Sequence, residues 1–445
     1  MRILFISLGC DKNLVDSEHM LGALAQAGHT MTDDPEQADV IVVNTCCFIH
    51  DAGEESISAI LEMAEYRKNG PCRALIVAGC LAERYRREIQ EEIPEVDAVL
   101  GTNSIDAIGD AVEKALKGEK SLILKPLEGI SRPGGRRVLS AGGRYGYLKI
   151  AEGCDKHCTY CIIPRLRGGY RSVPMEELLE EARYMADQGI EELILVAQET
   201  TVYGRDLYGE KSLHLLLGEL CRIPGLRWIR VLYCYPEEIY PELIQTMKEE
   251  PKICHYLDLP IQHASDRILK RMGRRTSRED LENIIGTLRR EIPDIALRTT
   301  LITGFPGETQ EDHRELLEFV NAAEFDRLGV FTYSREDDTP AASMEDQIPE
   351  EIKEERRGEL MELQQEISLE KGQQKIGTIL EVMIEGYLPE ERAYVGRSRA
   401  DAPEVDGYVF VNTGEALETG DFVQVRISGA QEYDLIGEIE NEFTE

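Results

Sequence analysis

The chain has 445 residues, more than one hydrophobic core usually organises, which predicts two or three domains. With 42% hydrophobic and 30% charged residues, its composition is typical of a folded globular protein and excludes a disordered chain or a small disulfide scaffold. Lysine and arginine total 50 against 84 acidic residues, so a net charge of −34 repels polyanions and favours a basic protein partner over nucleic acid.

Eleven cysteines are the second compositional signal. The amino-terminal apolar stretch is short and lacks a separate basic region, so we expect a first strand there rather than an export signal. No apolar run is long enough to span a bilayer, and we expect a cytoplasmic protein without membrane contact. Because the cytosol keeps thiols reduced, the cysteines are available to bind metal.

Residues 1–120 are predicted to form an open parallel α/β sheet domain. Apolar runs at 3–8, 39–43, 74–78 and 98–100 alternate with amphipathic stretches, a rhythm typical of such sheets. Residues 121–143 carry turn formers, including Pro133, Gly134, Gly135, Gly142 and Gly143, and little periodicity. We interpret them as a linker.

Residues 144–372 are predicted to form a partial (β/α)6 barrel with an exit helix. The strand candidates are 147–150, 193–197, 228–233, 256–259, 297–302 and 327–333. Helix-like segments follow these strands, except at the last one. The charge-rich stretch 346–372 has helical spacing and predicts a long helix leading out of the barrel.

Residues 373–445 are predicted to form a small antiparallel β-barrel, with strands such as 380–384, 408–411 and 422–427 between Gly and Asp turns. From residue 376 onward this tail has 16 acidic residues against four arginines and no lysine. An RNA-binding module would place basic residues against phosphates, so we expect the tail to repel RNA.

Cys154, Cys158 and Cys161 lie within eight positions, directly after the first strand of the predicted barrel. Thiolates are the usual ligands of iron-sulfur clusters, and three of them leave one iron of a four-iron cluster open for a chelating cofactor. Structural zinc is the alternative, but it needs four closed ligands and usually pairs two separated ligand clusters. The CxxxCxxC spacing resembles the radical S-adenosylmethionine (SAM) superfamily, in which SAM binds the open iron and is cleaved to a 5'-deoxyadenosyl radical.

Polar residues follow the second, fourth and fifth barrel strands, where barrel enzymes assemble their sites. By resemblance, the polar group after the second strand meets the SAM amino group, and the glycine-rich end of the fifth lets backbone approach the adenine. An equal alternative is that Gln198 only satisfies hydrogen bonds at the barrel rim and does not contact SAM. The candidate cofactor-binding residues are Gln198, Glu199, Gln262, Arg298, Thr303 and Gly304.

Cys10, Cys46 and Cys80 each follow a strand of the first domain, and the carboxyl ends of parallel strands meet at one edge. A single buried cysteine is usually a small hydrophobe, but three at equivalent positions favour a site. Together with the barrel motif and the β tail, they resemble the methylthiotransferases, which carry two 4Fe-4S clusters. The resemblance implies that these three cysteines hold the auxiliary cluster, whose open iron carries the sulfur for the substrate. Cys47 is a rival ligand beside Cys46.

The strings from Gly9 to Glu18, from Tyr147 to Asp155 and from Asp258 to Ser265 are similar to the RimO-type subfamily. That resemblance implies transfer of a methylthio group to the β-carbon of an aspartate in ribosomal protein number twelve of the small subunit. The basic substrate is expected to dock on the acidic carboxyl-terminal domain, with an electron donor such as flavodoxin and with RNA contact only through the ribosome. The alternatives are a transfer RNA adenosine methylthiotransferase and a non-catalytic iron-sulfur electron carrier.

Overall fold

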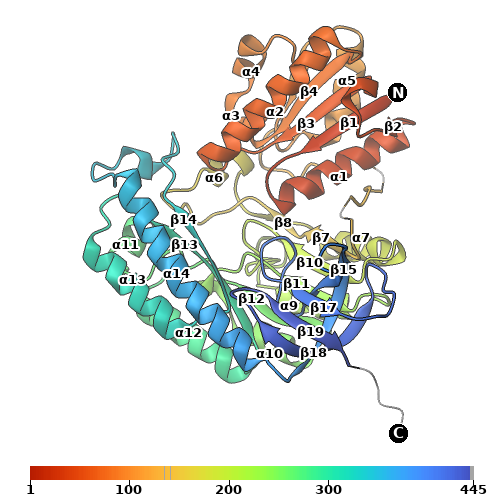
Figure 1. Cartoon of the computed structure of the whole chain (residues 1–445). Helices are drawn as coiled ribbons and strands as arrows, with labels where there is room; N and C mark the ends of the chain where they lie inside the picture. Colours follow the sequence, from red (N-terminus) through yellow and green to blue (C-terminus); the bar gives the residue numbers. More distant parts are fainter. Residues whose placement is uncertain (135, 141, 441–445) are drawn as a thin grey trace.

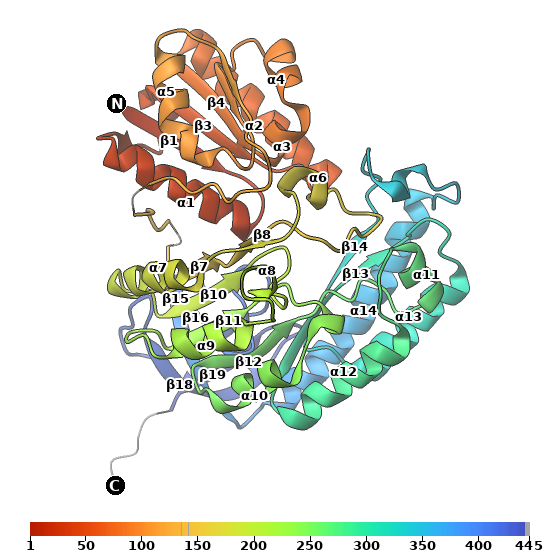
Figure 2. The same cartoon turned by 180° about the vertical axis from the view of Figure 1, so that it is seen from behind.

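The computed structural model describes residues 1–134, 136–140 and 142–440, and Figure 1 shows three packed parts in chain order. Gly135 and Ala141 of the expected linker and the last five residues of the expected third domain lie outside the described residues. The first part lies above the central sheet in Figures 1 and 2, and the carboxyl-terminal strands pack against the central part.

The first part is a six-stranded sheet whose neighbouring strands are all parallel, as the apolar runs predict. Its order is β2-β1-β3-β4-β5-β6. The strands are β1 (Arg2–Ser7), β2 (Thr30–Met31), β3 (Val40–Thr45), β4 (Ala74–Gly79), β5 (Ala98–Leu100) and β6 (Ser121–Ile123). The helices are α1 (Asp11–Gln26), α2 (His50–Asn69), α3 (Cys80–Tyr85), α4 (Arg87–Glu92) and α5 (Ile108–Leu116), with short 3-10 turns η1 (Pro35–Gln37) and η2 (Ile105–Ala107).

Two strands of this sheet differ from the expected pattern. β6 lies in the range interpreted as linker, and β2 has only two residues, too short to leave a hydrophobic period. Because β2 pairs on the far side of β1, the strand order reverses between β1 and β3. Ligands of open α/β sheets bind at such a switch point, outside the carboxyl ends of the strands.

The central part is an open six-stranded parallel sheet in the order β14-β13-β12-β11-β10-β7, which confirms the predicted partial barrel. The strands are β7 (Tyr145–Lys149), β10 (Glu192–Val196), β11 (Trp228–Val231), β12 (Ile253–Asp258), β13 (Ala296–Thr303) and β14 (Arg327–Thr332), with a small ribbon of β8 (Ala151–Glu152) and β9 (Arg171–Ser172). The helices are α6 (Ile163–Arg167), α7 (Met175–Asp187), α8 (Arg205–Tyr208), α9 (Leu213–Cys221), α10 (Pro241–Glu249), α11 (Asp266–Arg271), α12 (Arg278–Glu291), α13 (Gln310–Ala323) and α14 (Glu350–Gln374), with 3-10 turns η3 (Pro236–Glu238) and η4 (Pro340–Ser343).

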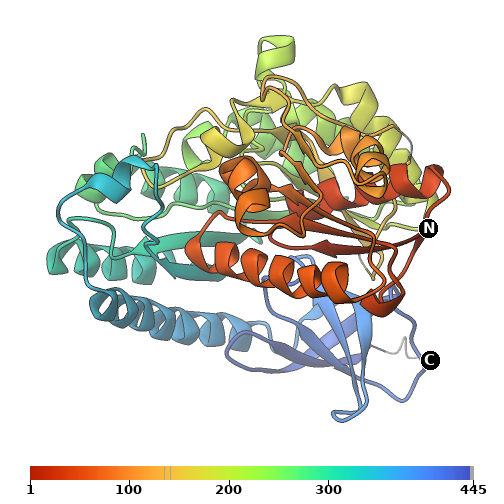
Figure 3. The same ribbon diagram turned by 90° about the horizontal axis from the view of Figure 1, so that it is seen from above.

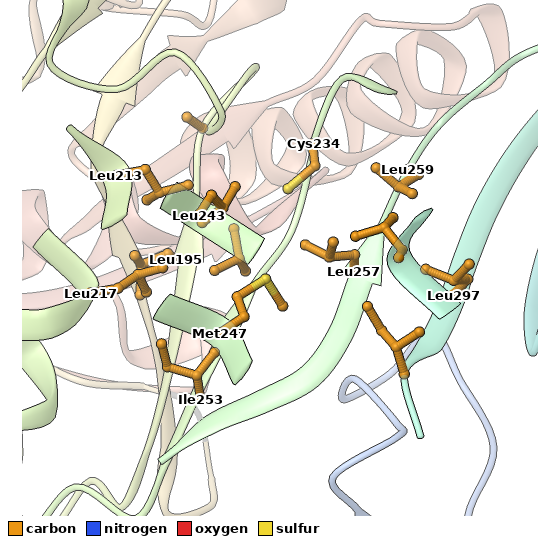
Figure 4. Packing of buried hydrophobic residues seen from close by; sticks show 14 of the residues in the cluster. Leu195, Leu213, Leu217, Cys234, Leu243, Met247, Ile253, Leu257, Leu259 and Leu297 are labelled. Atoms are coloured by element: carbon orange, nitrogen blue, oxygen red, sulfur yellow. The ribbon is translucent and has the colours of Figure 1, made fainter. Parts of the chain in front are cut away.

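Alternate side chains of each central strand face opposite sides, and the outer side packs against the helices. Figure 4 shows part of this core, in which Leu195 and Leu257 of the strands meet Leu213 and Met247 of α9 and α10. Cys234 lies in the same cluster and is fully buried. It is therefore a core thiol, and Cys72, Cys221 and Cys254 are buried in hydrophobic clusters in the same way.

The long helix predicted at 346–372 is α14, which covers the last strand of the central sheet. Leu360 and Ile367 bury its apolar stripe in the main core. Its last turn reaches the third part, where a Cβ added at Gly372 would lie 3.0 Å from Cβ of Ala430. Figure 3 shows α14 running toward the carboxyl-terminal strands.

The third part is a closed five-stranded barrel of β15 (Ile379–Leu388), β16 (Ala393–Ser398), β17 (Val409–Asn412), β18 (Phe422–Ala430) and β19 (Leu435–Ile439). The predicted small barrel is confirmed, but β17 and β19 pair in parallel. A ring with an odd number of strands cannot make every neighbouring pair antiparallel, which explains the one parallel pair.

The barrel covers part of the inner face of the central sheet. Trp228 stacks edge-on against Phe422 at 4.9 Å and donates from Nε1 to Glu381 at 2.9 Å. Arg397 of β16 is fully buried and pairs with Glu192, the first residue of β10, at 2.7 Å. Glu192 also accepts from Arg230 Nε at 2.8 Å, so one carboxylate joins arginines of both parts.

Replacing Arg397 with leucine should destabilise the chain, because it leaves the buried carboxylate of Glu192 with one arginine fewer. Breaking a buried ion pair from one side costs about 3–5 kcal/mol. We expect a lower midpoint of denaturant unfolding. Arg426→Gln is the control, since its pair with Glu440 is on the surface. Equal midpoints for Arg397→Leu and the control would contradict the assigned role.

Candidate functional site

The loop that carries Cys154, Cys158 and Cys161 follows the short strand β8 and ends at α6. Its backbone is fixed at two points: Cys154 N donates to Gly168 O at 3.1 Å, and Thr159 N donates to Met272 O at 2.9 Å. Gly153 has φ +78°, and a Cβ there would lie 2.1 Å from Gly169 O, so only glycine fits before the first cysteine.

The three thiols of this loop lie close together at the edge of a cavity. Burial raises the pKa of Cys154 to about 11 and that of Cys161 to about 12, and repulsion from the Cys158 thiolate adds to both. Cys158 and Cys161 border a cavity of ≈ 600 Å³ whose opposite wall is formed by residues such as Arg335, Thr339 and Ser343. The loop thus offers three thiols and adjacent space, which fits a cluster with a bound cofactor.

No three His, Cys, Asp or Glu side chains within the described ranges are placed to share a single metal ion. Structural zinc needs ligands that converge on one centre. In a four-iron cluster each thiolate binds a different iron.

Cys10, Cys46 and Cys80 meet at the switch point of the first sheet. Cys10 caps α1 after β1, Cys46 follows β3, and Cys80 begins α3 after β4. Gly9 has φ +87°, and a Cβ there would lie 2.6 Å from Cys46 Cβ, so the first two loops are in contact. The predicted convergence of the strand ends is therefore observed.

The thiols of this second set also influence one another. Burial raises the pKa of Cys80 to about 11, with further repulsion from Cys46 and Cys10. Burial also raises the pKa of Cys46, and Cys10 adds to that shift. Cys47 is buried, and Cys80 is the charge that most raises the pKa of its thiol after burial itself. The site edge therefore contains four thiols, of which Cys46 lies against the Cys10 loop.

A buried arginine, Arg167 at the end of α6, joins both cysteine sets. Its Nη2 donates to Asn13 Oδ1 at 2.6 Å and lies 3.6 Å from Cys80 Sγ. Its Nη1 pairs with Asp16 at 2.8 Å and with Glu152 at 3.1 Å. Glu152 is two residues before Cys154, so one guanidinium contacts the surroundings of both sets.

Asn13 extends this network to the two loops that carry Cys10 and Cys46. Its Nδ2 donates to Leu8 O at 2.8 Å and to Thr45 O at 2.9 Å, the carbonyls that precede Cys10 and Cys46. Lys149 of β7 pairs with both Asp16 and Glu152. Each buried charge in this network is paired with an opposite charge, as buried charges require.

Two candidate cofactor residues at the end of β10 lie beside the cysteine loop. Gln198 Oε1 accepts from Gly153 N at 2.8 Å, and its Nε2 donates to Glu152 at 2.9 Å, so this side chain supports the loop. Glu199 is buried near Cys154 and 3.6 Å from the ammonium of Lys156. Burial raises the pKa of Glu199 to about 7 despite that lysine.

Gln262, at the end of β12, keeps an unused polar atom. Its backbone has φ +69° and bridges to Leu301, and its Oε1 is buried without a hydrogen-bond partner among the described residues. An unpartnered buried oxygen costs stability unless a ligand satisfies it. Gln262 therefore fits a cofactor contact.

Three other candidate cofactor residues make contacts within the protein instead. Arg298 pairs with Asp258 at 2.8 Å and with Asp406 of the carboxyl-terminal barrel at 3.4 Å. Thr303 Oγ1 donates to Lys353 O at 3.3 Å. Gly304 has φ +66°, and a Cβ there would lie 2.2 Å from Lys353 Cγ, so packing against α14 explains this glycine.

Sequence reasoning missed Arg167, Lys12, Tyr233 and Tyr235. Tyr235 Oη lies 3.9 Å from Cys158 Sγ, and Lys12 Nζ lies 3.2 Å from the ring centroid of Tyr233. Lys12 lies two positions after Cys10 and Arg167 lies six positions after Cys161, so nearness to the cysteines was the available signal.

Three family descriptions match successive parts of the sequence. Residues 2–101 match "Uncharacterized protein family UPF0004", residues 148–320 match "Radical SAM superfamily" and residues 376–439 match "TRAM domain". A protein of Lachnoclostridium phytofermentans, described as ribosomal protein uS12 methylthiotransferase RimO, is 61% identical over 99% of this chain and 100% of its own length. The chain belongs to the RimO methylthiotransferase family.

A second relative with the same description, from Pelotomaculum thermopropionicum, is 51% identical over 98% of this chain and 99% of its own. Among solved structures, the radical SAM methyltransferase TsrM from Kitasatospora setae aligns with a TM-score of 0.55 and 15% identity, covering 85% of this chain and 78% of that one. This likeness supports the fold alone.

Family membership confirms the expected fold class and the class of enzyme, a radical SAM methylthiotransferase. The radical SAM match implies SAM and a 4Fe-4S cluster as cofactors. Within the part of the chain that the structure describes, no helix is long and apolar enough to cross a membrane.

If Cys10, Cys46 and Cys80 bind iron, as the sequence predicts, changing Arg167 to glutamine should weaken that binding, because Asn13, Asp16 and Cys80 lose their shared donor. The measurement is iron content after anaerobic reconstitution. Cys154, Cys158 and Cys161 are changed to alanine in this background, so that any bound iron belongs to the first-domain cysteines. Arg67→Gln is the control, since Arg67 pairs with Asp97 on another side of the same domain. Unchanged iron content would refute this role.

Proposed function

We propose that this chain inserts a methylthio group at the β-carbon of an aspartate in ribosomal protein uS12. The observation that carries the proposal is two three-cysteine sets held on either side of one buried arginine. The names of the relatives and the acidic charge of the chain support a basic ribosomal protein as substrate. We further propose that it works in the cytoplasm, where thiols stay reduced, with a reductant such as flavodoxin.

In this proposal Cys154, Cys158 and Cys161 hold one 4Fe-4S cluster, and Cys10, Cys46 and Cys80 hold a second, auxiliary one. A cluster with three thiolate ligands supplies an open iron that can bind the amino and carboxylate groups of SAM and deliver the electron that cleaves it. The raised thiol pKa values mean that cluster binding must release protons, so iron uptake should increase as pH rises.

Other residues of the chain position these groups. Glu199 is a buried acidic side chain near Cys154 and is proposed to meet the SAM amino group, displacing Lys156. Gln262 offers its unpartnered oxygen to SAM. Gln198 holds the loop through Gly153 and Glu152. Thr303 and Gly304 lie at the carboxyl end of β13, whereas Arg298 lies in its amino-terminal half. We assign these three residues support of Asp406 and α14 rather than direct SAM contact.

The acidic carboxyl-terminal barrel is proposed to dock uS12, but only part of its charge is available. Glu381, Glu385, Asp401 and Asp406 pair with arginines inside this chain. Exposed acids remain at the turn between β15 and β16 and in the loop between β17 and β18: Glu390, Glu391, Glu415 and Glu418. Exposed Tyr387 and Leu388 flank the first turn and add apolar contact area.

The central test is mass spectrometry of uS12 after incubation with reconstituted enzyme, SAM and reductant. We expect the mass of one methylthio group on an aspartate with wild-type protein. Cys154→Ala should abolish deoxyadenosine formation, whereas Cys46→Ala should retain it and abolish methylthiolation. Cys47→Ala is the matched control and should retain both activities. Modification of transfer RNA adenosine instead of uS12 would favour the alternative function, and no deoxyadenosine from wild-type protein would favour an electron carrier.

Changing Glu390, Glu391, Glu415 and Glu418 together to glutamine should weaken uS12 binding and reduce its salt dependence, because exposed charges steer a basic partner. The measurement is the dissociation constant at two salt concentrations. Deleting the whole barrel is a poorer test, since it would uncover Trp228 and Tyr256. Arg426→Gln is the control for surface changes. An unchanged salt dependence would place docking elsewhere.

A further inference from the structure

The segment that follows β11 lies between both cysteine sets. Tyr235 Oη is 3.9 Å from Cys158 Sγ. Two residues earlier, Tyr233 Oη donates to Asp11 Oδ1 at 3.1 Å, directly after Cys10. A substrate atom that reacts at both groups of three cysteines must therefore lie against residues 233–235.

Lys12 is the cation that faces this segment from the first domain. Its ammonium lies 3.2 Å from the centroid of the Tyr233 ring, and its side chain is only 9% exposed. Its position at the start of α1, after Cys10, is fixed by the Asn13 contacts to the two neighbouring loops. A buried ammonium over an aromatic ring favours an anion beside it.

Three other buried cations near the cysteines hold two or more carboxylates, whereas Arg274 pairs with Glu237 alone, at 4.0 Å, and donates to Pro260 O at 2.9 Å. Lys149 and Arg167 each pair with Asp16 and Glu152. Lys156 is surrounded by Glu199, Glu237 and Glu238. Within the described ranges, Lys12 pairs with a single carboxylate, that of its chain neighbour Asp11, at 2.9 Å.

The Asp11 carboxylate is incompletely satisfied. Its Oδ1 receives the Lys12 backbone N–H at 2.9 Å, the Lys12 ammonium and the Tyr233 hydroxyl. Its Oδ2 is buried and has no hydrogen-bond partner among the described residues. A buried carboxylate oxygen without a hydrogen-bond donor costs stability. The ion pair of Lys12 with Asp11 is therefore weak enough for another carboxylate to replace Asp11.

We propose that Lys12 binds the carboxylate of the target aspartate, taking it in exchange for Asp11, and so selects aspartate over a neutral side chain. This inference rests on the proposed function. The reacting β-carbon is bonded to the carboxylate carbon, so the cation that holds the carboxylate must lie beside the reacting position. Lys12 meets this requirement because it adjoins Cys10 on one side and the Tyr233–Tyr235 segment on the other.

The test measures binding of purified uS12, and of uS12 with its target aspartate changed to asparagine, to the reconstituted full chain without reductant. Wild-type enzyme should prefer the aspartate form by roughly tenfold or more, since a buried charge pair is lost with asparagine. Lys12→Met should lose that preference while binding the asparagine form as wild type does. Lys12→Arg should keep the preference, and Lys68→Met, an exposed lysine on α2, is the control.

The variant Asp11→Asn should change uS12 binding in the opposite direction to Lys12→Met. It keeps an oxygen for the Tyr233 hydroxyl but removes the competing charge, so uS12 should bind more tightly than to wild type. A purely structural role for the Asp11 and Lys12 pair predicts weaker binding of both uS12 forms instead. Iron content is measured for every variant, so that loss of the Cys10 set is recognised.

The outcomes separate this inference from the proposed function. If wild-type enzyme methylthiolates uS12 but Lys12→Met keeps the preference for aspartate, or weakens both forms equally, the role of Lys12 is wrong and the function stands. If wild-type enzyme leaves uS12 unmodified, the proposed function itself fails.

Discussion

The arrangement of both cysteine sets depends on the buried charge of Arg167. A guanidinium that is 2% exposed is tolerated because Asp16 and Glu152 neutralise it and Asn13 accepts one of its hydrogen bonds. Removing either carboxylate would leave an uncompensated positive charge in the interior. The network therefore fixes the first domain on the central sheet in one orientation, with the carboxyl ends of both sheets facing a common space.

The amino ends of the central strands are held by a similar buried charge network. Glu192 lies between Arg230 and Arg397, and the aromatic pair of Trp228 and Phe422 packs beside it. Because the carboxyl-terminal barrel occupies this region, three of its acidic residues, Glu381, Asp401 and Asp406, pair with arginines of the central part. Composition alone assigns that charge to a partner, whereas the structure divides it between internal pairing and the exposed turns.

Much of the fold was predictable because the strands are buried on both faces and leave continuous apolar runs. The convergence of Cys10, Cys46 and Cys80 followed from the geometry of parallel sheets. The role of Arg167 was not predictable, since Asp16 lies in another domain and no local pattern joins the two. Arg298 and Gly304 illustrate the same limit. Gly304 follows the carboxyl end of β13 and Arg298 lies in the amino-terminal half of that strand, but Asp406 and Lys353, from distant segments, determine what they contact.

The closure of the carboxyl-terminal barrel has a genetic consequence. β19 is the strand that joins β17 to β18, so a stop codon before Leu435 would open the ring and leave two unpaired strand edges. Exposed edges pair readily with other chains and promote aggregation. A nonsense mutation close to the end of this gene would thus be more damaging than its position suggests, although both cysteine sets would remain encoded.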